Sequence, residues 1–392
     1  MPVNDLTFNQ LSTVLASITR QATGQTVLAP TDTSSFVSVA NTALKTGYDP
    51  VLQAISQVLS RTIFSIRPYT RKFGGLMVTN QQYGNIVRKL SPVDKPFEDD
   101  ARFDLTDGES VDQYTVNKPG VLQTNFYGAN VYQKSLTIFR DQLDCAFSSP
   151  DEFARFISMA TGNASDMIEQ AHETTARATI ANLIGAIVGN YTAGKQIVHL
   201  LTEYNTATGL ALTAESVYQP ENFKPFMQWV YSRIASISSL LTERTTAFHA
   251  NITGKEVVRH TPFIRQRAYL YAPARYQVEA QVLADTYHDN YLRLADNETV
   301  NFWQALASPD SIKITPAYLD TTTGAVATGA AVEQGNIFGV IMDEEAAGYT
   351  VVNQWSASTP FNAKGGYSNI FWHFTDRYWN DFTENAVVLL LD

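Results

Sequence analysis

Two stretches near the N-terminus repeat apolar residues at helical spacing. Residues 5–20 place leucine, valine and isoleucine on one face and have Gly24 past the end, a pattern that predicts an amphipathic helix. The polar segment 21–35 is typical of a linker, and Pro50 opens a second helix that runs through Leu59. Such helices need a surface on which to bury their apolar faces. We therefore predict that residues 1–60 form an arm packed on another surface, such as a neighbouring copy.

Residues 97–140 have a different pattern. They are acidic at first and then alternate apolar and polar positions over 121–127 and 131–138, as strands do. An Asn-Lys-Pro-Gly turn signal at 117–120 lies between the halves. The segment predicts a long β-hairpin that leaves the core, and because an isolated hairpin is marginally stable, it implies a partner.

The strongest helix signal begins at Ser149, which is followed by Pro150, Asp151 and Glu152: an N-cap, a proline and two acids in the first turn. Apolar residues keep roughly helical spacing to Ile187. At 1.5 Å per residue this helix would be about 55 Å long. A helix of that length exceeds the diameter of a small domain, so we predict that it acts as a spine.

The remaining chain has a mixed α/β pattern without internal repeats or heptads. The pattern predicts strands at 196–204, 269–271, 312–314, 336–342, 368–374 and 386–391, helices over 223–241 and from 272, and a surface loop at 320–335.

Composition favours a protein that makes extensive contacts with other proteins. The 392 residues suggest two to three domains. Charged residues make up 17%, whereas 5 Trp, 19 Tyr and 21 Phe are present, and interface cores lose charge and gain aromatics. The one cysteine, Cys145, excludes an internal disulfide, and we expect it to be a small buried apolar residue. No export signal is visible, and the longest apolar run, 386–391, is too short for a membrane helix.

Charge is distributed unevenly along the chain. The net charge is −10, but residues 1–95 carry nine Lys/Arg against four Asp/Glu, and the rest carry 19 − 34 = −15. An acidic body disfavours broad nucleic-acid binding. Two interpretations remain open: solvated faces, or contact between the basic segment of one copy and the acidic loop of another. The candidate contact residues are Arg71, Lys72, Glu98, Asp99, Asp100 and Lys118.

No convincing active site is present in the sequence. None of the six histidines belongs to a His-Glu-x-x-His motif, and neither a Gly-x-Ser-x-Gly elbow nor a phosphate-binding loop occurs. The acids at 343–345 are typical of an exposed turn, and Asp376 and Asp381, on either side of Arg377, of turn or ion-pair residues between the last two strands. We predict no catalytic residue, no metal site and no cofactor.

The order of these parts resembles a known family. The stretches that carry the resemblance are RKFGGL at 71–76, YGNI at 83–86, VLQTNF at 121–126, FRDQL at 139–143, FSSPDEF at 147–153, GVIMD at 339–343 and GGYSNIFWH at 365–373. Together they resemble the major capsid protein of tailed bacteriophages, which has the HK97-like fold. The resemblance is closest to small short-tailed podophages of the picovirus type. It rests on the order of the elements and their residue patterns rather than on one motif.

The resemblance implies an α+β fold with five parts. These are an N-terminal arm (1–60), an extended-loop region (61–148), a peripheral domain with the spine helix (149–259), an axial α/β domain (260–359) and C-terminal strands returning to the peripheral domain (360–392). It implies pentamers and hexamers in an icosahedral shell around double-stranded DNA, assembled in the bacterial cytoplasm. It also implies a portal protein as partner, and a scaffolding protein from another gene or none. Some members cross-link a lysine to an asparagine, and Lys118 and Asn385 are candidates by position.

Two other functions remain open at this point. One is the shell protein of a bacterial nanocompartment of the same fold, although such chains are usually shorter. The other is a metal-independent hydrolase that uses His288 or His373 with nearby acids. A hydrolase would need a concave pocket with perturbed carboxylates.

Overall fold

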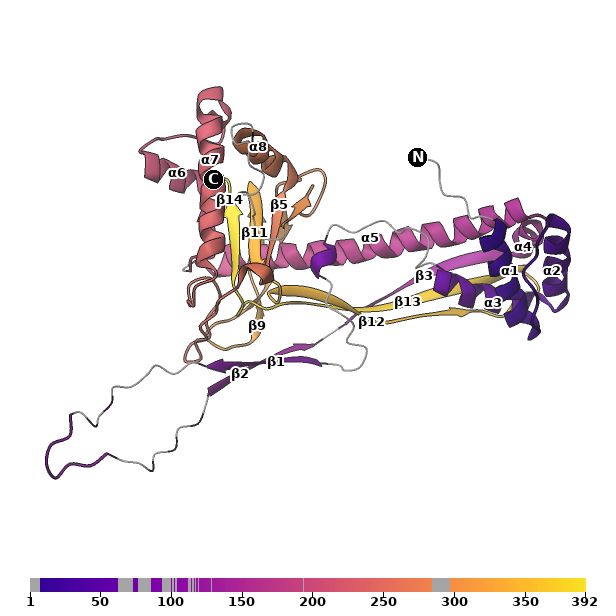
Figure 1. Cartoon of the computed structure of the whole chain (residues 1–392), viewed down its shortest axis with the longest axis horizontal. Coiled ribbons are helices and arrows are strands. Elements are labelled where there is room, and N and C mark those ends of the chain that lie inside the picture. Colours follow the sequence, from indigo (N-terminus) through magenta and orange to yellow (C-terminus); the bar gives the residue numbers. More distant parts are fainter. Residues whose placement is uncertain are drawn as a thin grey trace.

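The long axis of the molecule is set by one helix, α5 (Pro150–Asn190) (Figure 1). The computed structural model describes residues 8–62, 73–76, 86–93, 100, 102, 104–111, 114, 116, 118, 120–127, 129–192, 194–283 and 297–392. A group of helices lies at one end of α5, and a mixed sheet covered by further helices lies at the other (Figure 1). Between them a long antiparallel sheet runs along the same direction.

Helix α5 forms as predicted and extends three residues further. The Ser149 hydroxyl accepts a hydrogen bond from the Glu152 N–H at 3.3 Å, and Pro150 occupies the first turn. Its 41 residues give a length of about 60 Å. Apolar residues at helical spacing in its C-terminal half, including Leu183 and Ile187, are fully buried.

Residues 8–62 contain the helices α1 (Phe8–Thr23), α2 (Thr33–Lys45) and α3 (Tyr48–Thr62). The predicted linker therefore ends earlier than expected, because Asp32 caps α2 in a reciprocal box with Ser35. The apolar faces of these helices are covered within the chain, by α4 (Arg140–Ala146), the start of α5 and a nearby sheet. Phe36 lies edge-on to Phe153 at 5.6 Å. These helices are thus packed on another surface, as expected, and that surface belongs to the same chain.

The long sheet has the order β12 (Ala347–Ser358), β13 (Tyr367–Asn380), β3 (Asn130–Phe139), and both pairings are antiparallel. On β13 the alternate residues Ile370, Trp372 and Phe374 are buried against the N-terminal helices. Strand β3 was expected to pair with 121–127. Its partner is β13, because alternate residues of β3 point to the same face of the sheet as the buried residues of β13 and pack into the same core.

The hairpin is formed by a different pair of strands from the predicted pair, 121–127 with 131–138. Strand β1 (Ile86–Val93) pairs antiparallel with β2 (Gly120–Tyr127), from Ile86 opposite Tyr127 to Val93 opposite Gly120. Residues 94–119 therefore connect the two strands, and the turn signal at 117–120 stands at the start of β2.

The other end of the molecule holds a five-stranded sheet. Its order is β4 (Ile197–His199), β14 (Ala386–Leu390), β11 (Ile337–Asp343), β5 (Gln266–Tyr271), β6 (Asn297–Val300). Every residue of β11 and β14 is buried, between α5 on one face and α7 (Pro220–Leu240) with α8 (Ala272–Leu283) on the other. The strand expected at 196–204 is mostly helix α6 (Leu200–Thr208), in which Leu200, Leu201 and Tyr204 are buried at helical spacing.

Short elements complete the fold. Strand β7 (Ile312–Ile314) pairs with β10 (Val332–Gln334), and β8 (Ala317–Leu319) with β9 (Val326–Thr328), so the loop expected at 320–335 contains two strands. Within the described ranges, 3-10 helices occur at η1 (Gly74–Leu76), η3 (Ser216–Tyr218) and η4 (Phe263–Arg265). In the described part of the chain, no helix combines the length and apolar character needed to span a bilayer.

The Gly339→Ala variant is expected to be destabilised by roughly 1–3 kcal/mol, because an overpacked core side chain costs about that much. A Cβ at Gly339 would lie 2.6 Å from Leu270 Cδ2 and 2.8 Å from the Tyr269 carbonyl oxygen in a central strand. Denaturant unfolding of the purified protein measures the change. Gly335→Ala is the control, since a Cβ there meets nothing within 4 Å. Equal stability of the two variants would contradict this account.

Candidate functional site

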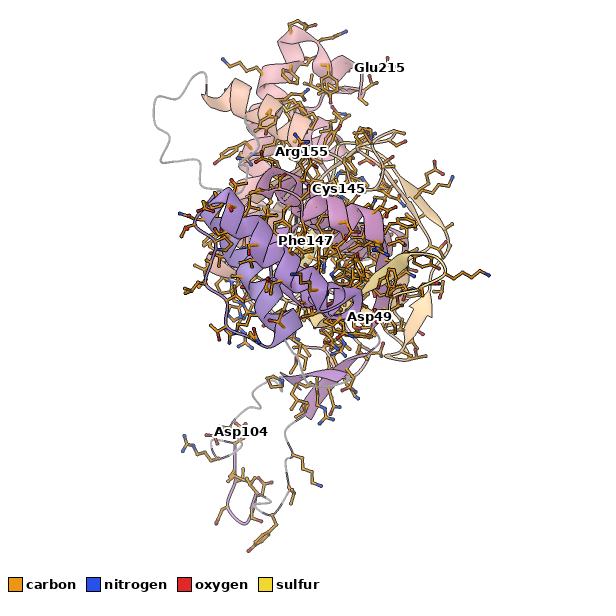
Figure 2. The ribbon with its side chains drawn as sticks, turned by 90° about the vertical axis from the view of Figure 1, so that its right-hand side faces the viewer. Asp49, Asp104, Cys145, Phe147, Arg155 and Glu215 are labelled. Carbon is orange, nitrogen blue, oxygen red and sulfur yellow. The ribbon has the colours of Figure 1, made fainter. Side chains whose placement is uncertain are left out.

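The hairpin of β1 and β2 is the part of the chain that projects furthest from the body (Figure 1). Residues 104–111, which lie between its strands, are all exposed, and Figure 2 shows Asp104 well away from the rest of the ribbon. Tyr114 is 82% exposed and Val116 78% exposed. Exposed large apolar side chains on a projecting segment favour contact with another protein.

A partly buried lysine fixes the start of this hairpin to the body. Lys89 on β1 has a side chain only 19% exposed, and its Nζ lies 2.9 Å from Asp381, 2.5 Å from Glu384 and 2.9 Å from Glu345. Asp381 and Glu384 belong to the turn between β13 and β14, and Glu345 to the turn before β12. The lysine thus ties β1 to two turns of the body.

Two arginines extend this ionic cluster. Arg259 lies 3.1 Å from Glu384 and donates to the Ser91 hydroxyl on β1 at 2.8 Å. Arg265 lies 2.9 Å from Glu344 and 3.7 Å from Asp343, and it also contacts Glu345. We call Lys89, Arg259, Arg265, Asp343, Glu344, Glu345, Asp381 and Glu384 the ionic base. Its five carboxylates outnumber its three cations.

Protonation in the ionic base follows from burial and pairing. Burial opposes the charge on Lys89, but Asp381 and Glu384 outweigh it and raise the pKa of the ammonium group. For Glu384 burial dominates over Lys89 and Arg259, so its pKa lies above the ordinary value. The half-exposed Glu345 behaves differently: burial is outweighed by hydrogen bonds to Lys89 and Arg265, which lower its pKa. Glu384 is therefore the carboxyl that accepts a proton more readily.

A second connection lies along α5, at the described part of the 71–76 motif. The Phe73 N–H donates to Glu173 Oε2 at 3.5 Å, and the Phe73 ring lies 5.0 Å from Tyr269. A Cβ on Gly75 would approach Glu298 Oε1 to 2.7 Å, so glycine allows this close contact. Residues 73–76 are thereby held between the spine helix and the five-stranded sheet.

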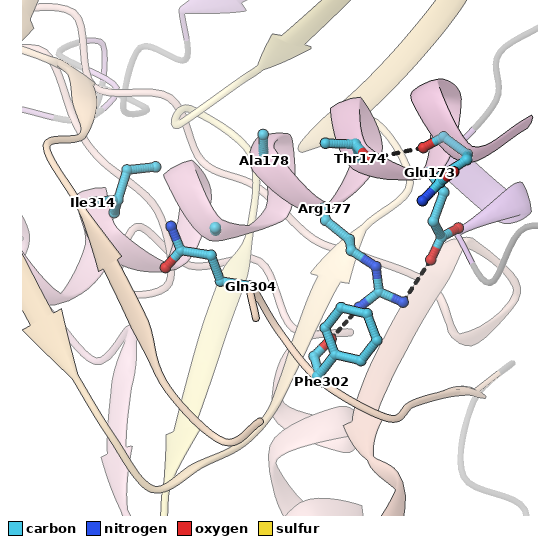
Figure 3. Close-up of a pocket in the computed structure, with 9 residues that line it drawn as sticks. Glu173, Thr174, Arg177, Ala178, Phe302, Gln304 and Ile314 are labelled. Carbon is cyan, nitrogen blue, oxygen red and sulfur yellow. Dashed lines mark hydrogen bonds and ion pairs between the residues drawn. The ribbon is translucent and has the colours of Figure 1, made fainter. Parts of the chain in front are cut away.

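A cavity of about 740 Å³ lies beside this contact (Figure 3). Arg177 ion-pairs with Glu173 at 2.6 Å, and its guanidinium stacks 3.8 Å over the Phe302 ring while donating to the Phe302 carbonyl. The other polar lining residues are Gln170, Thr174 and Gln304. The two charged residues pair with each other, and the described lining residues include no histidine, cysteine or serine.

Most of the predicted contact residues lie outside the described residues. This holds for Arg71, Lys72, Glu98 and Asp99, and also for His288. Asp100 and Lys118 are described, and both are exposed in the segment between β1 and β2. The proposed contact between basic and acidic segments therefore stays a prediction.

The position proposed for a cross-link does not fit. Asn385 is fully buried; its Oδ1 lies 3.1 Å from His249 Nδ1, and its amide donates to the Thr261 hydroxyl at 3.2 Å. An amide engaged at both ends inside the protein is not presented to Lys118 of any copy.

Several smaller expectations were wrong. Cys145 is exposed rather than buried. Asp376 and Arg377 are not turn residues: they lie inside β13 and are buried, because the strand continues to Asn380. The ion-pair alternative holds for Asp376, whose carboxylate lies 3.4 Å from His172 Nδ1. In the acidic stretch at 343–345, Asp343 is buried and accepts a hydrogen bond from Thr261. The ion-pair role predicted for Asp381 is confirmed.

The histidines and acids do not converge on a catalytic arrangement in the described residues. His373 lies on β13 and stacks on Trp355 with ring centroids 3.9 Å apart. No group of three or more His, Cys, Asp or Glu in the described ranges is arranged to hold a metal ion.

Sequence reasoning missed the ionic base. Lys89 is separated from Asp381 by 292 positions, and Arg259 and Arg265 precede their acidic partners by about 80 to 125 positions. One local signal existed: a lysine inside a strand that also holds leucine, valine and isoleucine. Its partners could not be identified without the fold.

Comparison with protein families and solved structures gives a consistent answer. The model of the Phi29-like phage major capsid protein family matches residues 15–390. Comparison with the curated proteins finds no match. Among solved structures, a chain from the capsid of Staphylococcus phage Andhra aligns with a TM-score of 0.54 at 10% identity, over 83% of this chain and 85% of that chain. A chain from the native bacteriophage P68 structure of head fiber and inner core protein gp22 aligns with a TM-score of 0.53 at 10% identity, over 83% and 86%. At such identities the structural matches show the fold alone.

Replacing Lys89 by glutamine is expected to destabilise the unassembled protein by roughly 3 kcal/mol, because breaking a buried ion pair leaves uncompensated charge. Asp381, Glu384 and Glu345 would lose their shared cation. Denaturant unfolding measures the loss. Lys118→Gln, at an exposed position on the same hairpin, is expected to change stability little. A similar effect of both substitutions would refute the role of Lys89.

The contribution of Glu345 should depend on pH. Its folded-state pKa is lowered, so its stabilisation is present above the unfolded value of about 4.5 and is lost as the pH falls through the folded value. Glu345→Gln should thus be less stable than the wild type at pH 7, and the difference should shrink below pH 4.5. Unfolding at several pH values tests this. Glu333→Gln, which breaks the exposed pair with Lys313, should show a small difference at every pH.

Proposed function

This chain belongs to the Phi29-like phage major capsid protein family, and from that premise we propose that the projecting hairpin of each copy holds it to a neighbouring copy in the head shell. Membership makes the chain a structural component of the virion of a tailed phage rather than an enzyme. Its mixed α+β fold matches HK97-like phage capsids. The nanocompartment and hydrolase interpretations are therefore set aside.

The observation that carries the proposal is the hairpin itself. Two strands leave the body, are tied to it near their start by Lys89 and by the hydrogen bond from Arg259 to Ser91, and continue into a segment whose described residues are exposed. A two-stranded ribbon of this kind is marginally stable alone. Contact with a second copy would cover its apolar side chains and stabilise it.

We assign the five parts of the chain as the family resemblance implies: arm (1–60), extended-loop region (61–148), peripheral domain (149–259), axial domain (260–359) and returning C-terminal strands (360–392). Helix α5 in the peripheral range and strands β5, β6 and β11 in the axial range support this division. The last part contacts both the peripheral and the axial range, since β14 pairs with β4 (Ile197–His199) on one side and with β11 on the other, and β13 pairs with β3 of the extended-loop region.

We further propose that copies form the pentamers and hexamers of an icosahedral shell and bind a portal protein, with a scaffolding protein from another gene or none. The shell would enclose double-stranded DNA without sequence-specific contacts. The net charge of −10 supports this, because phosphate binding needs clustered cations.

Within this shell, Arg71 and Lys72 of one copy would meet Glu98, Asp99 and Asp100 of the next, with Lys118 at the same contact. The support is the abrupt change of charge between the two segments. Complementary charges of this kind mainly fix register and partner choice. Asp100, the described member of the acidic group, is exposed and so available to a partner.

Charge reversal tests this contact. Purified wild-type protein, examined by electron microscopy and sedimentation velocity, should form closed shells or rings of five and six copies. Arg71→Glu with Lys72→Glu, or Asp99→Lys with Asp100→Lys, should each reduce assembly because like charges then face each other. Combining all four substitutions should restore it.

Two outcomes would argue against the proposal. If neither reversal affects assembly, these segments do not meet. If the fourfold variant assembles no better than either double variant, each segment acts alone. Circular dichroism of every variant serves as the control, since a folded but unassembled protein separates lost contact from lost fold.

A further inference from the structure

The described strands differ in how their free edges are protected. A free edge presents unpaired N–H and C=O groups, and native proteins guard it with charge, proline or shortness. Strand β1 carries Arg88, Lys89 and Pro92, β3 carries Lys134, and β6 carries Glu298. Strands β4, β7, β8, β9 and β10 have three residues each. Each of these edges therefore has a feature that disfavours pairing with a further strand.

Two free edges among the described strands lack such protection. Strand β2 has eight residues and β12 has twelve, and neither contains a charged residue or a proline. Each is paired on one side only: β2 with β1, and β12 with β13. A bulge interrupts β12 between Val351 and Asn353, and the pairing with β13 is regular from Asn353 to Ser358.

Exposed apolar or aromatic side chains lie beside both free edges. Beside the β12 edge, the sheet face away from the helices carries Trp355, 49% exposed and stacked on His373. On the ribbon, Val121 of β2 is 53% exposed and Leu90 of β1 is 63% exposed. Loss of charge together with exposed aromatic and aliphatic side chains is the composition of an interface core.

The ribbon is also oriented for a partner outside its own chain. Lys89 fixes the start of the ribbon to the body through its ion pairs in the ionic base. The Phe126 ring of β2 packs against the Trp379 ring on β13, with the ring centroids 6.2 Å apart. Within one chain β2 and β12 are not paired. Because β1 is guarded and β2 is not, the ribbon can accept a further strand on one side only.

We propose that β2 of one copy adds to the free edge of β12 in a neighbouring copy. The three-stranded sheet would then become five-stranded in the order β3, β13, β12, β2, β1, with the last two strands from the second copy. This inference rests on the proposed function and specifies the contact that the hairpin makes. Because β2 and β12 are different surfaces, the contact is head-to-tail, the type that generates rings.

Disulfide trapping in assembled particles tests the pairing. In a Cys145→Ser background, one cysteine is placed on β2 (Gln123→Cys or Asn125→Cys) and one on β12 (Asn353→Cys or Ala357→Cys). All four positions are exposed. After mild oxidation, at least one of the four combinations should give a ladder of multimers on a non-reducing denaturing gel. A disulfide requires Cα atoms within roughly 7 Å, so a ladder reports adjacent strands.

The matched control moves the body cysteine to Ser135→Cys on β3, an exposed position of the same sheet. A ladder from β3 with none from β12 would overturn the proposal, as would particles that give no ladder in any combination. Failure of the wild-type protein to form particles would instead count against the proposed function. The two failures are therefore distinguishable.

A lysine scan supplies a second readout without cross-linking. Asn353→Lys guards the β12 edge with charge and should leave folded protein that no longer assembles. Gln133→Lys adds the same charge at an exposed position of β3 and should assemble like the wild type. Equal assembly of both variants, with both folded by circular dichroism, would contradict strand addition at β12.

Discussion

The constraint on which the rest of the fold depends is that one helix serves two apolar cores. Near its start, Phe153 and Phe156 of α5 pack with the N-terminal helices and the long sheet. Near its end, Leu183 and Ile187 pack against the five-stranded sheet. On α5 the two cores are separated by roughly two turns of helix, from Ile168 to Ala176. The relative position of the two ends of the molecule is therefore set by α5 and by the strands β12 and β13 that run beside it.

The partly buried ionic base has a different role from these cores. Burial of charge seldom adds net stability, but it restricts geometry because each charge needs its partner in place. Lys89 has three carboxylates around it, and they come from turns that end or begin strands of both sheets. Apolar packing thus builds the body, while charge pairing sets the direction in which the hairpin leaves it.

The sequence predicted the elements better than their partners. The N-cap at Ser149 and the helical spacing that follows are local signals, and α5 formed as expected. The alternation at 131–138 likewise predicted β3, but its partner, β13, lies more than 200 positions away. Pairing depends on which apolar faces meet in the folded chain, and alternation alone does not carry that information. The ion pair between Lys89 and Asp381 could not be predicted for the same reason. The family assignment succeeded because it used the order of elements, which survives when individual residues change.

The exposed thiol of Cys145 has a practical consequence. The chain contains a single cysteine, and it lies in α4, at the end of the molecule opposite the five-stranded sheet. A maleimide reagent would therefore attach one label to each copy at one defined place. In a closed particle such labels would repeat with the symmetry of the lattice, and distances measured between them by spectroscopy would report its spacing without any change to the natural sequence.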